Sequence, residues 1–281
     1  MSKRVAYLGP AGTFTEQATL KYAADAQLLP FASITAVAAA VGAEVAEEGV
    51  VPIENSLQGS VTETLDLLIH GPPIFIRHEL ALPIEHYLMG KPGVEVEKVQ
   101  VIYSHPQALA QCRSFLERCF PKAQMVAALS TTGAVEQMQQ SPTPAAAIAP
   151  LRAAELYGAE VLARHIQDNP NNVTRFVVLG HSDHNPTGGD KTSICFSFAE
   201  DRPGLLYAVM GEFARRNINL TKVESRPTRQ VLGEYIFLVD LEGHREDTTV
   251  RDALEQVRGM TSMFKVLGSY PRMRTNPHPK G

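Results

Sequence analysis

Over its first 180 residues the chain alternates short apolar runs with helical patterns, and this alternation limits the folds open to it. The apolar runs have the length of buried strands. The segments between them carry helix signals, such as Ser33 as an N-cap and Pro106 at a first helical position. Strands that alternate with helices are typical of sheets covered by helices on their faces. We therefore expect α/β architecture with largely parallel sheets.

The expected elements of this region follow from the same patterns. The expected strands are 3–8, 49–53, 74–82, 84–89, 99–103, 124–127, 145–148 and 174–179. The expected helices are 15–22, 33–47, 60–69, 106–118, 131–139 and 150–157.

Residues 181–190, HSDHNPTGGD, are polar and rich in helix and strand breakers, so they form the best linker in the chain. Beyond the linker the order of elements changes to βαββαβ. The expected elements are strand 193–198, helix 204–216, strands 218–225 and 233–241, helix 250–258 and strand 264–269. This order is the ferredoxin-like plan, with two helices on one face of an antiparallel sheet. The expected organisation is an α/β region over 1–180, a ferredoxin-like region over 191–270 and a tail over 271–281.

Composition excludes several classes of protein. Hydrophobic residues make up 44% of the chain, which is enough for more than one buried core, and the net charge is −4. A net negative charge disfavours nucleic-acid binding. The chain contains no run of about 18 apolar residues, so we expect no membrane span. Strand-like sequence from Lys3 leaves no room for a signal peptide, and three cysteines without CxxC spacing fit a reducing cytosol. We expect a cytoplasmic protein that contacts neither nucleic acid nor membrane.

Four times in the first region, a strand ends in a polar, loop-forming segment just before a helix. These segments are 9–15, 54–60, 104–107 and 130–132. Ligands of open α/β sheets bind beyond the carboxyl ends of the strands, where helix N-termini attract anions. The pattern predicts a small anionic ligand held by neutral donors. Taken one at a time, Ser130 or Thr131 could be a simple helix cap, and His105 a capped surface histidine.

The segment 171–176, NNVTRF, places Arg175 between Thr174 and Phe176 at the start of a strand. An arginine can bind a carboxylate through two parallel hydrogen bonds, and a phenylalanine can lie against a flat ring. The alternative is an ordinary surface arginine on an edge strand.

Several of these segments resemble the signature segments of prephenate dehydratases, in the order of that family. They are 9–14 (GPAGTF), 52–56 (PIENS) with Gly59, 104–109 (SHPQAL) and 174–176 (TRF). The region after the linker resembles an ACT domain, whose phenylalanine-sensing segments match 201–206 (DRPGLL) and 224–227 (ESRP). The resemblance covers roughly residues 3–270. Because no chorismate-mutase region precedes residue 3, we expect the single-activity form.

The resemblance implies a fold similar to periplasmic-binding proteins, with two α/β lobes and a cleft between them. One lobe would comprise about 1–77 and 165–180, and the other about 78–164. The expected strand 174–179 agrees, since it would return to the first sheet.

The implied reaction converts prephenate to phenylpyruvate, carbon dioxide and water in phenylalanine biosynthesis, without a metal or other cofactor. Thr174 would donate a hydrogen bond to the leaving hydroxyl, with Glu54 or His105 as acid or relay. Glu54 could equally be a salt-bridge carboxylate. Arg175 would grip the side-chain carboxylate, and Phe176 would pack behind it. The other expected substrate contacts are mostly neutral donors: Thr13, Asn55, Ser56, Ser104, His105, Gln107, Ser130, Thr131 and Thr132.

For the ACT-like region the resemblance implies binding of the effector L-phenylalanine between paired domains, in a homodimer or homotetramer. The expected effector contacts are Gly204, Leu205, Leu206, Asn217, Asn219, Glu224 and Ser225. Leu205 stands where the family often has Ala, so it would tune the affinity. Two alternatives remain open: an arogenate dehydratase, whose substrate carries an amine in place of the keto group, and a non-catalytic protein that binds small anions on the same fold.

Overall fold

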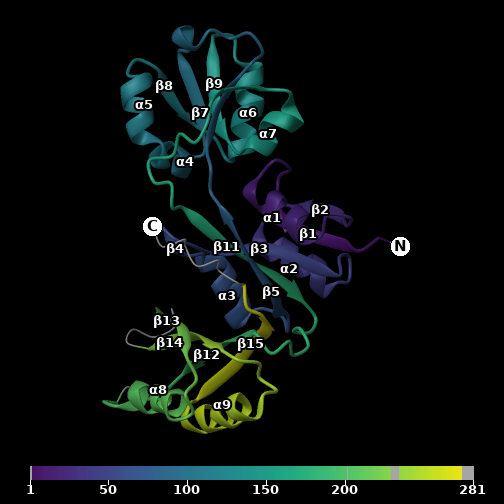
Figure 1. Ribbon diagram of the computed structural model, residues 1–281, viewed down its shortest axis with the longest axis vertical. Coiled ribbons are helices and arrows are strands. Elements are labelled where there is room, and N and C mark those ends of the chain that lie inside the picture. The colour runs from purple at the N-terminus through teal and green to yellow at the C-terminus, as the bar shows by residue number, and fades with distance from the viewer. Residues whose placement is uncertain (1, 201, 229–233, 274–281) are drawn as a thin grey trace. The chain divides into compact units, whose positions relative to one another are not determined.

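A computed structural model describes residues 2–200, 202–228 and 234–273 of the 281-residue chain (Figure 1). The chain divides into two compact units. The first comprises Met1–Val37, Val50–Val61 and Ala81–Phe176, and the second Ala38–Gly49, Thr62–Leu80 and Val177–Gly281. Within the described ranges, no helix has both the length and the apolar character needed to span a membrane.

The first sheet has the strand order β2-β1-β3-β11-β5, with β4 paired to β3. Its strands are β1 (Arg4–Leu8), β2 (Gln27–Phe31), β3 (Glu48–Asn55), β4 (Gly59–Ser60), β5 (Phe75–Pro83) and β11 (Val173–Gly180). The accompanying helices are α1 (Phe14–Tyr22), α2 (Ile34–Gly42) and α3 (Thr62–His70). The predicted return of the 174–179 strand to this sheet is confirmed, because β11 lies between β3 and β5.

Two local predictions for this sheet were wrong. β2 was missed, since its residues are mostly half-exposed and include Pro30, although it pairs in parallel register with β1. The helix predicted over 33–47 ends at Gly42, and Glu44 adopts a left-handed backbone with φ 56°. The amides of Val45 and Ala46 then both bond the Ala40 carbonyl, which closes the helix C-terminus.

The second sheet has the order β10-β6-β9-β7-β8. Its strands are β6 (Tyr87–Gly90), β7 (Val101–Ser104), β8 (Gln124–Ala127), β9 (Ala145–Ala149) and β10 (Glu160–Ala163). The helices are α4 (Pro106–Gln111), α5 (Arg113–Cys119), α6 (Thr131–Gln140) and α7 (Leu151–Tyr157), with a 3₁₀ turn at Val96–Lys98. Figure 1 shows α4 and α5 on one face of this sheet, and α6 and α7 on the other.

The alanine-rich β9 explains how both faces of the second sheet are covered. Ala145 and Ala147 pack toward α6 and α7, whereas Ala146 and Ile148 pack toward α4 and α5, since successive side chains of a strand alternate. The expectation of largely parallel sheets is corrected to mixed sheets. β7 is parallel to β8 and β9, but β6 is antiparallel to both β9 and β10. The helix predicted over 106–118 is broken at Cys112 into α4 and α5.

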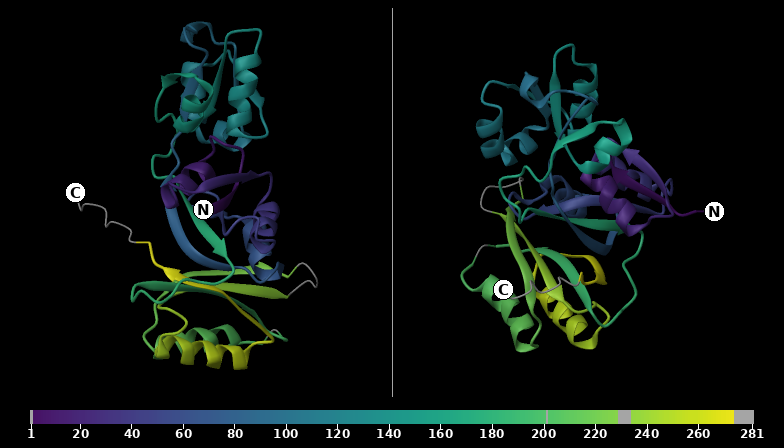
Figure 2. Two further views of the ribbon diagram at one scale, coloured as in Figure 1. Left: turned by 90° about the vertical axis from the view of Figure 1, so that its right-hand side faces the viewer. Right: turned by 45° about the horizontal axis from the view of Figure 1, so that its top comes forward.

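The βαββαβ plan predicted after the linker is confirmed. Its elements are β12 (Asp190–Ser197), α8 (Leu205–Arg215), β13 (Leu220–Pro227), β14 (Tyr235–Glu242), α9 (Thr248–Met260) and β15 (Met263–Pro271). The sheet order is β13-β14-β12-β15, and its strands pair antiparallel. Figure 2 shows both helices on one face of the sheet. The core of this region, between the helices and the sheet, includes Phe196, Val209, Phe213 and Val257.

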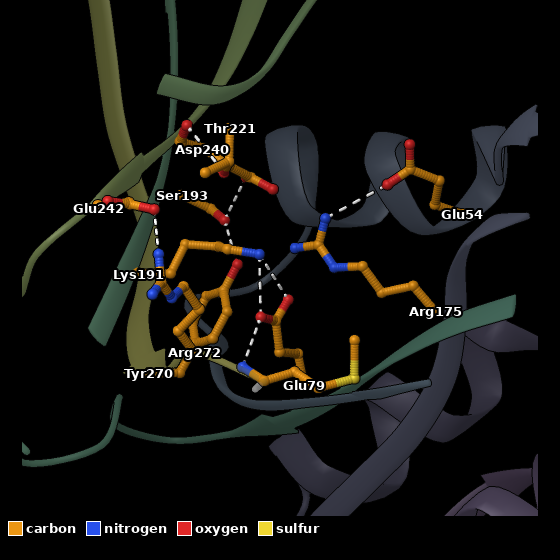
Figure 3. Close-up of polar contacts among 11 residues, drawn as sticks. Glu54, Glu79, Arg175, Lys191, Ser193, Thr221, Asp240, Glu242, Tyr270 and Arg272 are labelled. Carbon is orange, nitrogen blue, oxygen red and sulfur yellow. Dashed lines mark hydrogen bonds and ion pairs between the residues drawn. The ribbon is translucent and has the colours of Figure 1, made fainter. Parts of the chain in front are cut away.

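Within the second unit, α3 and β5 pack against the sheet of the ferredoxin-like region. Lys191 donates to both carboxylate oxygens of Glu79, at 2.9 and 3.0 Å, in a buried ion pair (Figure 3). A Cβ on Gly268, whose φ is +149°, would lie 2.0 Å from the Ile76 carbonyl oxygen, so only glycine permits this approach. These contacts explain why residues 62–80 group with the C-terminal region rather than with the first unit.

Candidate active site

A cavity of about 520 Å³ lies within the first unit. Eight of the residues predicted to bind or transform the substrate line it: Thr13, Asn55, His105, Gln107, Ser130, Thr131, Thr174 and Phe176. The fold brings them together from the end of β3, the first half of β11 and the N-termini of α1, α4 and α6. None of the described residues that line this cavity is a lysine or an arginine.

Apolar side chains form much of the cavity wall. Phe14, Ile34, Ile84 and Phe176 all contribute, and Phe176 is only 1% exposed. Leu129, at the start of the loop before α6, lines the cavity with a fully exposed side chain. The wall therefore suits a ligand with a flat hydrocarbon ring as well as polar groups.

Asn55 connects the cavity wall to the hydroxyl of Thr174. The Nδ2 amide of Asn55 donates to Thr174 Oγ1 at 2.9 Å and to Asn172 Oδ1 at 2.7 Å. The Oδ1 atom of Asn55 accepts from the backbone amides of Leu57 and Gln58, at 3.0 and 3.1 Å. All the polar atoms of the Asn55 side chain are thus occupied within the fold.

This bonding pattern determines which way the Thr174 hydroxyl can act. Backbone amides only donate, so the oxygen of Asn55 must face Leu57 and Gln58, and its NH₂ group must face Thr174. Thr174 Oγ1 is the acceptor of that hydrogen bond, which leaves its own hydrogen available to a ligand. Asn55 therefore positions Thr174 as a donor. The sequence had suggested that Asn55 itself donates to the ligand, but both of its N–H groups are already used within the protein.

Arg175 and Glu54 lie on the opposite face of their strands from the cavity. Successive side chains alternate along a strand, so Arg175 points away from the side that Thr174 and Phe176 share. The same holds for Glu54, next to Asn55 on β3. Arg175 Nη1 contacts Glu54 Oε2 at 3.3 Å (Figure 3), and neither residue lines the cavity.

This geometry bears on two sequence predictions. Arg175, predicted to grip a carboxylate, is not among the residues that line the cavity, and Glu54 forms an ion pair, as in the salt-bridge alternative to a role as acid or relay. The pair joins β3 to β11, the two strands that carry Asn55 and Thr174.

Three helix caps also line the cavity, so a capping role does not exclude the predicted ligand-binding role. Thr13 accepts from the Glu16 amide at the start of α1, and its hydroxyl donates to Pro10. His105 Nδ1 accepts from the Gln107 amide at the start of α4, and Ser130 Oγ accepts from the Gly133 amide at the start of α6. The N-termini of these helices direct partial positive charge into the cavity.

Ser56, Ser104 and Thr132 were predicted to contact the substrate but do not line the cavity. Ser56 exchanges hydrogen bonds with the start of β11, and Ser104, fully buried, donates to the Ile148 carbonyl at 2.7 Å. Thr132 is fully buried, and its methyl group would lie 3.1 Å from a Cβ on Gly12, where φ is +84°. All three act within the fold of this unit.

His86, Gln111 and Gln58 line the cavity and were not singled out from the sequence. His86 Nε2 lies 2.8 Å from Gln111 Oε1, and the edge of the Phe14 ring contacts the imidazole at 5.7 Å between centroids. Burial lowers the pKa of His86 from its ordinary value, despite the hydrogen bond with Gln111. Gln111 lies one helical turn after Gln107, a spacing that could have drawn attention to it. No three His, Cys, Asp or Glu residues in the described ranges form a group able to hold a metal ion.

A second cavity, of about 190 Å³, lies in the ferredoxin-like region. Gly204, Leu205 and Leu206 line it together with Tyr207 and Phe237, and Gly204 begins α8 with a left-handed φ of 89°. Asp201, part of the DRPGLL segment, and residue 233 of the predicted strand 233–241 lie outside the described residues, as does the tail beyond residue 273.

The remaining predicted effector contacts do not line this second cavity. Asn217 and Asn219 follow the C-terminus of α8, whereas Gly204 stands at its N-terminus. Glu224 and Ser225 project to opposite faces of β13 because they are neighbours on a strand, and Glu224 forms an ion pair with Lys222 at 3.2 Å.

The family model of prephenate dehydratase matches residues 5–184, and that of the ACT domain matches residues 193–259. The chain belongs to the prephenate dehydratase family. It is 43% identical to the bifunctional chorismate mutase/prephenate dehydratase of Aquifex aeolicus over 96% of this chain and 74% of that protein. It is 39% identical to the prephenate dehydratase of Methanocaldococcus jannaschii over 96% of this chain and 99% of that protein.

A solved structure supports membership of the prephenate dehydratase family across both regions. The prephenate dehydratase of Arthrobacter aurescens, in complex with L-Phe, aligns with a TM-score of 0.87 and 40% identity, over 96% of this chain and 90% of that one. The cavity around Thr174 therefore lies in the part of the chain that matches the catalytic family, and the second cavity lies in its ACT domain.

Proposed function

We propose that this member of the prephenate dehydratase family converts prephenate to phenylpyruvate, carbon dioxide and water in the cavity around Thr174. The observation that carries the proposal is the hydrogen bond from Asn55 to Thr174 Oγ1, which leaves the Thr174 hydroxyl hydrogen free at the cavity wall.

The reaction requires two bonds to break across one ring. The electron pair of the bond between the ring carbon and its carboxylate moves into the ring as carbon dioxide leaves. The bond between the opposite ring carbon and its hydroxyl breaks with the electron pair on oxygen, and the ring becomes aromatic. The departing oxygen takes up one proton to leave as water, and solvent supplies that proton overall. A donor aimed at this oxygen lowers the barrier, with general acid assistance worth roughly 10²–10⁴-fold.

Thr174 supplies that donor. A threonine hydroxyl is a weak acid, so its contribution is a hydrogen bond that strengthens as negative charge develops on the leaving oxygen. Asn55 supports this role because its own donation into Thr174 Oγ1 polarises the hydroxyl toward the ligand.

Neutral groups hold the two carboxylates of the substrate. Ser130, Thr131 and Gln107 line the cavity beside the N-termini of α4 and α6. Helix termini and neutral donors attract anions without a full positive charge. This suits a carboxylate that must leave as uncharged carbon dioxide, because a tightly paired cation would oppose its departure.

Incubation of the purified chain with prephenate, followed by assay for phenylpyruvate, tests the activity. Arogenate is supplied in a parallel reaction that is assayed for phenylalanine. We expect turnover of prephenate to exceed turnover of arogenate. Binding of prephenate without product would contradict the proposal in favour of a non-catalytic anion-binding protein.

We infer further that the ACT domain binds L-phenylalanine and that two copies of the chain pair through it. Gly204 and Asn217 flank the eleven residues of α8, a helix about 17 Å long at 1.5 Å per residue. A ligand that touches both segments therefore needs a second copy of the domain. β13, at one end of the four-stranded sheet, offers an edge at which such a copy could add.

A further inference from the structure

His86 and Gln111 form a buried polar pair on the wall of the catalytic cavity. His86 is 2% exposed and lies between β5 and β6, and its backbone is held by bonds to Gln167 and Ile166. Its ring Nε2 lies 2.8 Å from Gln111 Oε1. Among the described residues, neither the second ring nitrogen of His86 nor the Nε2 amide of Gln111 has a hydrogen-bond partner, although both atoms are buried.

Two placements of the hydrogens are compatible with the 2.8 Å contact between His86 and Gln111. In the first, His86 carries its proton on Nε2 and donates to Gln111 Oε1, so the Gln111 NH₂ group is left for a ligand. In the second, the amide is reversed, its NH₂ group donates to His86, and the Nδ1–H of His86 is left buried without an acceptor.

Each arrangement leaves two N–H groups of the pair without an acceptor in the protein: both hydrogens of the Gln111 NH₂ group in the first, and one of these together with the Nδ1–H of His86 in the second. The first arrangement is favoured because it places both unpaired donors on Gln111, at the wall of a cavity that must take a dicarboxylate, and this point rests on the proposed function. Burial disfavours the charged form of His86, so the ring is available as a neutral, single-proton donor.

We propose that His86 is a positioning residue that, through its Nε2–H donor, holds the Gln111 carboxamide with its NH₂ group directed at the substrate. Phe14 supports the arrangement, because the contact between its ring and the imidazole is edge-on, at 79° between planes, and restricts rotation of the imidazole. The role differs from acid–base catalysis, since His86 gives up no proton and acts on the substrate through Gln111.

Variants of His86 test the proposal by activity. His86→Leu removes the donor and keeps an apolar side chain of similar size, whereas His86→Gln keeps an uncharged N–H at a similar reach. We expect His86→Leu to lower kcat/KM for prephenate about tenfold, in keeping with the loss of an oriented hydrogen bond. We expect His86→Gln to stay within about threefold of the unsubstituted protein.

A double-substitution cycle separates positioning from a general structural role. In a Gln111→Met background the carboxamide is already absent, so His86→Leu should lower kcat/KM by less than about twofold. A tenfold loss in both backgrounds would overturn the proposal, as would an equal loss in His86→Gln and His86→Leu.

The ring nitrogens of His86 provide a test that needs no turnover. In ¹⁵N-labelled full-length protein at pH 7, with His86→Gln used to assign the signals, we expect Nε2 to be protonated and Nδ1 to be bare. A proton on Nδ1 would overturn the proposal even if the variants lose activity. If the unsubstituted protein fails to turn over prephenate, the proposed function fails, and the tautomer measurement still decides the placement of the Gln111 amide.

Discussion

At the scale of single residues, the direction of one hydrogen bond decides how the site works. Because Asn55 donates into Thr174 Oγ1, the hydrogen of the Thr174 hydroxyl remains free to donate to the ligand. We expect Thr174→Ala to lower kcat about 10²-fold or more while KM changes little, since the contact strengthens only in the transition state. Thr174→Ser is the matched control and should retain most activity. Steady-state kinetics measures both, and a near-normal kcat for Thr174→Ala would exclude the hydroxyl from the reaction.

Arg175 provides a second residue-scale prediction, in which the geometry argues against the role expected from the sequence. An arginine that grips a carboxylate through two bonds cannot be replaced by lysine, but Arg175 points away from the cavity toward Glu54. We therefore expect Arg175→Lys to keep KM for prephenate within about twofold, because a lysine can also pair with Glu54. A KM raised tenfold or more would show that Arg175 does reach the substrate.

The three cysteines should differ sharply in reactivity. Burial raises the pKa of both the Cys112 and Cys195 thiols to about 12, whereas Cys119 is exposed. The thiolate is the reactive form, so at pH 8 a disulfide reagent should modify Cys119 quickly and the other two only after unfolding. Mass spectrometry of the native and denatured protein counts the modified thiols. Fast labelling of Cys112 in the native protein would contradict the burial of this thiol.

At the scale of elements, one buried ion pair joins β5 to β12. Glu79 is 3% exposed, and its carboxylate accepts from Lys191 and from the Met273 amide. Removal of one partner from a buried pair leaves the other charge uncompensated, at a cost of about 3–5 kcal/mol. We expect Glu79→Gln to lower the unfolding temperature of the second unit by several degrees.

The pair between Lys98 and Glu95 is the matched control for this prediction, because both of its side chains are more than 60% exposed. Glu95→Gln should change stability by less than about 1 kcal/mol. Differential scanning calorimetry of the two variants makes the comparison. Equal unfolding temperatures for Glu79→Gln and the unsubstituted protein would show that the buried pair contributes no net stability.

At the scale of the whole molecule, the expected property is control of the catalytic region by the ACT domain. An effector shifts a conformational equilibrium only if it binds one state more tightly than the other. We expect millimolar L-phenylalanine to lower activity and to increase the proportion of paired chains, measured by enzyme assay and by analytical ultracentrifugation. If activity stays full at that concentration and the proportion of paired chains does not change, the ACT domain does not control the catalytic region through L-phenylalanine.

Leu205 allows the same control to be tested by substitution, because it lines the second cavity and lies far in sequence from the catalytic residues. Leu205→Ala should shift the phenylalanine concentration for half-inhibition by about threefold or more, with activity in the absence of effector unchanged. An unchanged half-inhibition concentration would place the effector elsewhere.

Local sequence signals determined those features of the protein that depend on neighbours in the chain. Helix caps at Thr13, His105 and Ser130, the breaker-rich linker, and the change from α/β order to βαββαβ order were all predictable, because caps, breakers and side-chain periodicity act over a few residues. The motif segments also predicted that Thr174 and Asn55 share one site, and both residues line the same cavity.

Tertiary structure alone decided which side chains face the cavity and which way strands run. Glu54 and Arg175 belong to the same motifs as Asn55 and Thr174, yet they lie on the other face of the sheet. Side chains alternate along each strand, and the pairing of β3 with β11 brings Glu54 beside Arg175 on the face away from the cavity. His86 and Gln111 are 25 residues apart and meet only because the tertiary structure brings the segment between β5 and β6 to α4. Likewise β6 runs antiparallel to β9 because pairing direction depends on the path of the whole chain, which no short segment encodes.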